Sequence, residues 1–439
     1  MNAAADDTAA EEVVELCRDL LRIDTSNTGD PATTAGERVA AEYVAEKLAE
    51  VGIEAELHES APGRANLVAR IPGADPGRGA LLVHGHLDVV PADASEWTVH
   101  PFSGEQRDGY LWGRGAIDMK DFDAMMLAVV RQWKRTGVTP PRDIVLAFTA
   151  DEEAGMEYGS QFLVREHADL LEGCTEAVGE VGGFSYTVND DLRLYLVETA
   201  EKGIDWLRLH ARGRPGHGSF LHDDNAVTAL AEAVARVGRH RFPVVVTPTV
   251  RAFLESVSDA LGIELDPDDP EVAVAKLGPI ANLIGATIRN TANPTRLEAG
   301  YKDNVIPGRA SATIDCRTLP GQAEAFLEQL REVIGPDIEI EHLQRQAAVE
   351  TGFDGALVDA MAAALRAEDA GARTVPYMLS GGTDAKAFTR LGIRCFGFAP
   401  LRLPADLNFS ALFHGVDERV PVDGLQFGVR VLDRFLRAS

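Results

Sequence analysis

Short apolar strands that alternate with amphipathic helices constrain the fold of this 439-residue chain more than any other feature. Strands separated by helices of this kind predict an α/β sheet with helices on both faces. The helical patterns occupy residues 11–23, 36–52, 121–137 and 160–171, and the strand patterns occupy residues 65–71, 79–90, 143–150 and 175–180.

The pattern changes near Glu201. We expect the α/β domain to comprise residues 1–199 and 347–439, and residues 200–346 to form an inserted α+β module. Residues 240–295 are apolar and interrupted by proline, and they are assigned to no element. The strands and helices of the module are predicted at residues 202–214, 225–238, 309–321, 323–335 and 337–343.

Composition excludes several classes of function. The formal net charge of −27 argues against nucleic acid as a partner, because phosphate binding needs clustered Lys and Arg. No window approaches the roughly 18 apolar residues of a membrane span. The acidic N-terminal segment lacks a signal-peptide pattern, so we expect a cytoplasmic protein without membrane contact. The widely spaced Cys17, Cys174, Cys316 and Cys395 are expected to be free thiols.

Three consecutive carboxylates, Asp151, Glu152 and Glu153, follow the apolar run Asp143–Phe148. Adjacent like charges repel one another unless a cation or a proton lies between them. Two interpretations are open at this point, a solvated acidic turn and a metal site.

Potential metal ligands recur at the ends of the other predicted strands. His84 and His86 follow one strand, and Glu180 follows another. Asp118 lies in a glycine-rich turn before a helix, and His414 lies near the C-terminus. Ligands of open α/β sheets bind beyond the carboxyl ends of the strands, so these residues are expected to meet at one edge.

The combination of side chains favours a metal site. Taken singly, Asp118 could be a helix N-cap and Glu180 part of a surface turn. Imidazole and carboxylate without thiolate suit zinc, cobalt or manganese. A bridging carboxylate, most naturally Asp118, could hold two ions about 3.5–4 Å apart. The predicted ligands are His86, Asp118, Glu153, Glu180 and His414.

Five motifs resemble those of the zinc-dependent exopeptidase and aminoacylase family: GHLDVVP, GRGAIDMK, TADEEAG, GEVGG and FHGVDERVPV. They occur in the family's order over nearly the whole chain. The family includes glutamate carboxypeptidase, succinyl-diaminopimelate desuccinylase, acetylornithine deacetylase, aminoacylase-1 and the carboxypeptidase S group. The resemblance implies a catalytic domain built on a mixed sheet flanked by helices, with an inserted α+β ferredoxin-like lid and dimerisation domain.

The resemblance also implies two divalent metal ions per chain, zinc in the first place and cobalt or manganese as alternatives. His86 and Glu180 would ligate one ion. Glu153 and His414 would ligate the other, and Asp118 would bridge the two.

Catalytic roles follow from the same resemblance. Glu152 would be the general base that activates a water between the ions. Asp88 would hold the His86 imidazole in its ligating tautomer. Asp151 is expected to have a structural role in the turn.

Substrate-binding residues are implied mainly in the inserted module. His217 would contact the substrate carbonyl in the transition state, from the same chain or a partner subunit. Asn304 and Arg317 match positions that bind polar groups of the substrate, and Arg317 suits a free carboxylate. Arg345 is a second candidate for that carboxylate. A glycine-rich substrate loop would contribute Gly381, Gly382 and Thr383.

The sequence therefore predicts a di-metal hydrolase that cleaves an amide bond of a peptide or N-acyl amino acid with a free carboxylate. An aminoacylase or deacylase, rather than a peptidase, is the alternative within this class, because both share the metal chemistry. A non-catalytic metal-binding homologue is disfavoured, since all predicted ligands and Glu152 are present. The expected partners are a small-molecule substrate and a second copy of the chain, through the lid.

Overall fold

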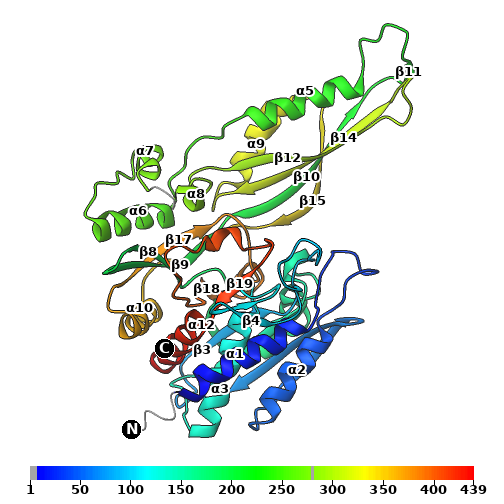
Figure 1. Cartoon of the computed structure of the whole chain (residues 1–439). Coiled ribbons are helices and arrows are strands. Elements are labelled where there is room, and N and C mark those ends of the chain that lie inside the picture. The colour runs from blue at the N-terminus through cyan, green and yellow to red at the C-terminus, as the bar shows by residue number, and fades with distance from the viewer. Residues whose placement is uncertain (1–6, 278–280) are drawn as a thin grey trace. The chain divides into compact units, whose positions relative to one another are not determined.

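Two compact units make up the chain in this computed structural model, which describes residues 7–277 and 281–439 (Figure 1). The described helices include none that is both long and apolar enough to cross a membrane. The first unit comprises the chain up to Thr199, Phe353–Pro376 and Thr383–Ser439, and the second comprises Ala200–Gly352 and Tyr377–Gly382.

A mixed sheet forms the centre of the first unit. Its strands run in the order β1-β2-β6-β3-β7-β18-β9, with β8 and β17 also paired to β9. The neighbours β6, β3, β7 and β18 are parallel, whereas β1, β2, β8 and β9 pair in antiparallel fashion. The strands are β1 (Glu56–Ala61), β2 (Arg64–Ile71), β3 (Ala80–His86), β6 (Ile144–Thr149), β7 (Cys174–Gly179), β8 (Phe184–Asn189), β9 (Leu192–Glu201), β17 (Ala372–Leu379) and β18 (Arg394–Gly397).

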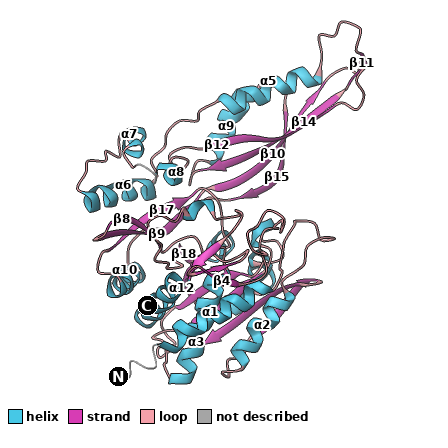
Figure 2. Cartoon of the chain, in the orientation of Figure 1, coloured by secondary structure: helices cyan, strands magenta, loops and turns pink. Residues whose placement is uncertain are grey.

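Helices cover both faces of this sheet, as Figure 2 shows for α1 and α3 on one side. Alternate residues of a strand face opposite sides, so Leu81 and Val83 pack in one core and Leu82 packs in the other. The prediction of a mixed sheet flanked by helices is confirmed. One core contains α1 (Asp7–Arg22), α2 (Arg38–Ala49), α3 (Lys120–Thr136), α10 (Ala356–Glu368) and α12 (Val422–Ala438), and the other contains α4 (Ser160–Glu166) and α11 (Ala385–Phe388).

The predicted helix over residues 160–171 is wrong in its second half. Helix α4 ends at Glu166, because His167 leaves the helical region with φ −135° and ψ 35°. Residues Ala168–Leu171 form a separate 3-10 turn. A small sheet of β4 (Glu105–Arg107), β5 (Tyr110–Trp112) and β19 (Arg419–Pro421) was not predicted.

The second unit contains a four-stranded antiparallel sheet in the order β12-β14-β10-β15. Leu207, Ile314 and Phe326 are fully buried in the core between this sheet and its two helices. The elements are β10 (Gly203–Arg212), β11 (Gly216–His217), α5 (Ala226–Arg239), β12 (Thr291–Ala299), β13 (Val305–Ile306), β14 (Arg309–Thr318), α9 (Ala323–Ile334), β15 (Glu339–Gln346) and β16 (Val349–Glu350).

Residues 240–295, which the sequence left unassigned, hold one helix of 14 residues, two short helices and the start of β12. Thr247 caps the first helix by accepting the Val250 amide, and Gly262 ends it in the left-handed region at φ 63°. Residues 278–280 of this stretch lie outside the described residues. The helices are α6 (Pro248–Leu261), α7 (Pro270–Ala275) and α8 (Ala281–Ile284).

Candidate metal centre

The carboxyl ends of three neighbouring parallel strands bring most of the predicted ligands together. His86 is the last residue of β3, and Glu180 follows β7 directly. Glu152 and Glu153 lie in a single 3-10 turn immediately after β6. Because β3 pairs in parallel with both β6 and β7, these residues converge at the same sheet edge.

Two further side chains reach this edge from loops. Asp118 lies just before α3, and His414 lies in the loop before β19. The buried Glu418 connects the two loops, because its carboxylate accepts the backbone amides of Gly115 at 3.1 Å and Ile117 at 2.8 Å. The five predicted ligands therefore meet although they lie far apart in the chain.

The five side chains form two groups that share Asp118. In the first group, Nε2 of His86 lies 3.2 Å from Oδ1 of Asp118 and 3.5 Å from Oε2 of Glu180. In the second group, Nε2 of His414 lies 3.2 Å from Oδ2 of Asp118 and 3.0 Å from Oε2 of Glu153. Each oxygen of Asp118 thus faces a different group.

These distances fit metal ligands. Two donors bound to one tetrahedral ion at about 2.1 Å each lie about 3.4 Å apart. The second oxygen of Glu153, Oε1, is buried and has no hydrogen-bond partner among the described residues. A buried carboxylate oxygen without a donor is costly unless a cation binds it.

The charges of the site also fit divalent cations. Burial raises the pKa of Glu180 to about 8, and burial likewise raises the pKa values of Glu152 and Glu153. Hydrogen bonds to Asp118 and Glu153 raise the pKa of His414 to about 10. Divalent ions would ionise these carboxyl groups and keep the imidazoles neutral.

Asp88 contacts the Nδ1 side of the His86 imidazole, through its backbone carbonyl and its carboxylate. Nδ1 of His86 lies 2.9 Å from the backbone carbonyl of Asp88 and 3.5 Å from its carboxylate. The carbonyl fixes the proton on Nδ1 and leaves Nε2 as the ligand atom. The carboxylate also accepts the amides of Glu152 at 3.0 Å and Glu153 at 3.2 Å.

Asp151, the first of the three consecutive carboxylates, points away from both groups of ligands. Its carboxylate accepts hydrogen bonds from Arg64 at 2.9 Å, Asn27 at 3.0 Å and the Tyr158 amide at 3.1 Å. The run Asp151–Glu153 is therefore not a solvated acidic turn, because Asp151 is paired with a buried cation.

The predicted substrate residues of the second unit lie in two places. His217 in β11 pairs with Val305 of β13, directly after Asn304. The amide of Ser219 donates to Nδ1 of His217 at 3.2 Å, which leaves the proton of a neutral imidazole on Nε2. His217 can therefore act as a hydrogen-bond donor through Nε2.

Arg317 and Arg345 lie on opposite faces of the four-stranded sheet. Arg345 is paired in register with Asp205, and Asp205 is also paired with the buried Cys316 on the helix-covered face. Arg317 follows Cys316 and faces the other side, where its guanidinium binds Asp315 at 2.7 and 3.1 Å. The two arginines cannot bind the same substrate group from one face.

The glycine-rich loop spans the division between the units. Gly381 and Gly382 belong to the second unit, and Thr383 belongs to the first. The next residue, Asp384, is buried and accepts the hydroxyl groups of Thr149 and Ser160, which flank the turn that holds Glu152 and Glu153.

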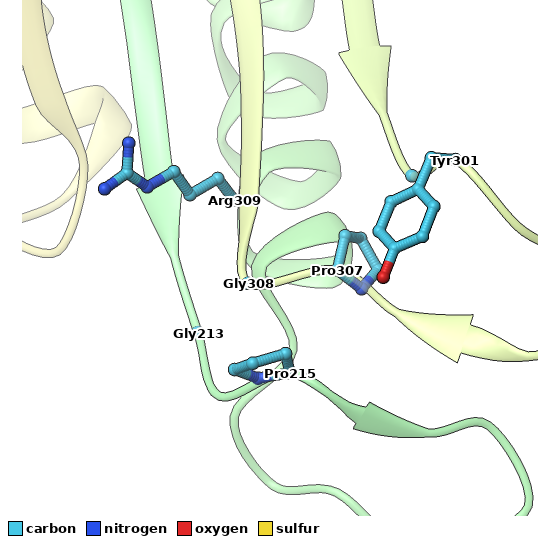
Figure 3. Close-up of a pocket in the computed structure, with 7 residues that line it drawn as sticks. Gly213, Pro215, Tyr301, Pro307, Gly308 and Arg309 are labelled. Carbon is cyan, nitrogen blue, oxygen red and sulfur yellow. The ribbon is translucent and has the colours of Figure 1, made fainter.

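A hollow in the second unit contains none of the predicted site residues. Figure 3 shows that Tyr301 and Pro307 lie on one side of it, while Arg309 points away from them. Its lining residues are Gly213, Pro215, Gly300, Tyr301, Pro307, Gly308 and Arg309.

Four buried residues that support the site were not predicted: Asn27, Arg64, Asp384 and Glu418. Glu418 lies within the motif FHGVDERVPV and Asp384 directly follows the glycine-rich loop, so their positions were a usable signal. Asn27 and Arg64 lie far from any ligand in the chain, and no spacing rule connects them to it.

A mixed α/β sheet with imidazole and carboxylate groups clustered beyond its strand ends defines the class of the protein, a metal-dependent hydrolase. The family model described as Peptidase family M20/M25/M40 matches residues 82–438, and the chain belongs to this family. This membership confirms the resemblance and the prediction of a hydrolytic enzyme.

Similar proteins cover nearly the whole chain. Aminoacylase-1 of Sus scrofa is 28% identical over 443 residues, which cover 97% of this chain and 94% of that protein. N-fatty-acyl-amino acid synthase/hydrolase PM20D1 of Xenopus tropicalis is 26% identical over 458 residues, covering 98% of this chain and 86% of that protein. The M20 family metallo-carboxypeptidase Sso-CP2 from Sulfolobus solfataricus shares the fold, with a TM-score of 0.73, 19% identity and coverage of 97% and 99%.

Proposed function

We propose that the protein is a di-metal amidohydrolase. His86 and Glu180 hold one divalent ion, Glu153 and His414 hold the other, and Asp118 binds both. The observation that carries this proposal is the placement of the two Asp118 oxygens, each 3.2 Å from a different imidazole. Because the ligands are imidazole and carboxylate, zinc is the proposed ion, with cobalt or manganese as alternatives.

The chain's own residues would move the protons of the reaction. When bound, the ions supply polarisation of the scissile carbonyl and a water of lowered pKa. Glu152 takes a proton from the attacking water and later passes it to the leaving amine. The products are a carboxylate and an amine, and no covalent intermediate with the protein is needed.

We propose the first unit as the catalytic domain and the second as the lid. His217 of the lid donates a hydrogen bond from Nε2 to the carbonyl oxygen as negative charge develops there. Asn304, Gly381, Gly382 and Thr383 are proposed to contact the substrate. The homodimer through the lid and the cytoplasmic location stay predictions.

The proposed substrate is a peptide or an N-acyl amino acid with a free carboxylate, which Arg317 binds. The aminoacylase reading is favoured by one observation: aminoacylase-1 of Sus scrofa aligns with 97% of this chain. The peptidase reading draws on the shared fold of a metallo-carboxypeptidase. Hydrolysis of a panel of dipeptides and N-acyl amino acids by zinc-loaded protein separates the two, and no hydrolysis of either class would refute the proposal.

A further inference from the structure

A buried chain of polar side chains leads from the start of α2 to the turn that carries Glu152 and Glu153. It lies entirely within the first unit. Each member is at most 7% exposed, so water does not screen these charges. In order of contact, the members are Glu37, Arg64, Asp151, Asn27 and Asp88.

Arg64 is the only cation in this chain of contacts. Its Nε and Nη2 atoms donate to the two oxygens of Glu37 at 2.9 and 2.8 Å. Nη2 also donates to Oδ1 of Asp151 at 2.9 Å. Removal of the guanidinium would leave two buried carboxylates without their common counter-charge.

Asp151 has a left-handed backbone, with φ 66° and ψ 17°. Residues other than glycine rarely adopt this conformation, although Asp and Asn do so more easily than most. Its side chain is held by Arg64, and its backbone carbonyl accepts the Met156 amide at 2.6 Å. Asp151 therefore faces the interior of the unit while the next two residues turn toward the metal centre.

Asn27 connects the two sides of the turn. Its Nδ2 donates to Asp151 at 3.0 Å and to Asp88 at 2.9 Å. Asp88 in turn accepts the amides of Glu152 and Glu153. Asp88 thus binds the backbone amides of the two glutamates, and Asp151 fixes the position immediately before them.

We propose that Arg64 is a positioning residue for Glu152 and Glu153: by pairing with Asp151 it keeps the turn in the conformation that presents both glutamates to the ions. Arg64 touches neither ligand nor reacting atom. The assignment rests on the proposed function for the roles of the two glutamates, and it adds the residue that orients them.

The test compares Arg64→Met, Arg64→Lys and the double variant Arg64→Met/Asp151→Asn with a matched control, Arg142→Met. Arg142 is also a buried arginine, paired with Glu176 at 2.8 Å, but it precedes the opposite end of β6. Loss of either ion pair should lower the thermal midpoint. Only loss of Arg64 should change the metal centre.

We expect Arg64→Met to lower kcat and zinc affinity about 10- to 100-fold, as changes behind metal ligands do, with KM nearly unchanged. Arg64→Lys should recover part of the loss, since it restores the charge without the fork. Asp151→Asn added to Arg64→Met should raise kcat about threefold or more relative to Arg64→Met, because it removes the unpaired carboxylate next to the turn. Wild-type kcat and zinc affinity in Arg64→Met, or losses equal to those of Arg142→Met, would overturn the proposal.

Hydrogen exchange separates this inference from the proposed function. The amides of Glu152, Glu153 and Tyr158 should exchange faster in Arg64→Met and at the wild-type rate in Arg142→Met, whether or not the enzyme cleaves any substrate tried. Unchanged exchange in Arg64→Met refutes the positioning role. A wild-type protein that hydrolyses no amide refutes the proposed function. The exchange rates of the Arg64→Met variant still test the positioning role in that case.

Discussion

His414 and Glu153 are in direct contact, with Nε2 of the imidazole 3.0 Å from Oε2 of the carboxylate. The preceding residue, Glu152, belongs to neither group of candidate ligands, and no residue within 7–277 and 281–439 donates a hydrogen bond to its carboxylate. Two adjacent glutamates thus have different surroundings, one suited to hold an ion and the other free to accept a proton.

The first prediction separates these two glutamates. Glu152→Gln should retain both metal ions, because it removes a base and not a ligand. Its turnover should fall by roughly 10²-fold or more, the scale of general-base catalysis. Glu153→Gln should bind less metal. Metal content and kcat of the two variants give the measurement, and near-normal turnover of Glu152→Gln would show that another group is the base.

The second prediction concerns the residue shared by the two groups. Asp118→Asn should lower the affinity for both ions, whereas His414→Ala should lower mainly the affinity for one, since only Asp118 lies in both groups. Chelation should abolish activity, and zinc or cobalt should restore it. Titration of the metal-free protein with zinc measures the affinity for each ion in the wild type and in both variants. Full activity with well below one ion per chain would contradict the two-ion site.

The third prediction uses the opposite orientation of two arginines. Arg317→Ala should lower kcat/KM for free-acid substrates by about tenfold or more, because the substrate carboxylate loses its guanidinium partner. Amidated versions of the same substrate should be nearly unaffected. Arg345→Ala is the control, since Arg345 lies on the helix-covered face, where it binds Glu324 at 2.9 Å. Equal losses on acid and amide would rule out carboxylate recognition by Arg317.

The fourth prediction concerns stability and pH. Hydrogen bonds from Arg193 lower the pKa of Asp369 from 3.8 to about 2, with Tyr195 donating a further bond at 2.8 Å. A carboxyl group whose pKa is lower in the folded state than in the unfolded state stabilises the folded state at pH values above the unfolded pKa. This stabilisation is lost as the pH falls through the folded pKa. The shift corresponds to about 2 kcal/mol of unfolding free energy at neutral pH.

Asp369→Asn should therefore lower the urea midpoint near neutral pH, and the difference from wild type should shrink as pH falls from 3.8 toward 2. Asp354→Asn is a suitable control. Asp354 pairs with Arg394 at 3.1 Å, but its side chain is 82% exposed, and such pairs contribute little. A constant difference across this pH range would show that the Asp369 carboxylate is not the source.

The sequence predicted those parts of the molecule that have a local signature. His86, Glu153 and Glu180 stand at the ends of apolar strands. The alternation of these strands with helices along the chain is enough to predict the parallel sheet that brings the three residues together. Strand β12 was missed because it contains Pro294, which argues against a strand interior. Helices α7 and α8 are too short to show a helical period.

Side-chain partners could not be predicted, because they depend on contacts between distant segments. Asp88 was expected near the His86 ring, but the sequence did not show that its carboxylate also accepts the amide of Glu152 in the neighbouring turn. Nothing in the sequence pairs Arg64 with Asp151, since these residues meet only when β2 and β6 lie side by side. The sequence also did not show that Arg345 lies on the helix-covered face, because that placement follows from the register with β10.

Two ions that share one carboxylate cannot bind independently. Each oxygen of Asp118 serves a different group, so an ion in one group withdraws charge from the donor of the other. Thermodynamic linkage makes this effect reciprocal: whatever the first ion does to the affinity of the second, the second does to the first. Metal titration of a site that holds two ions in this way should therefore follow a coupled two-step isotherm, in which the singly loaded protein has its own affinity for the second ion.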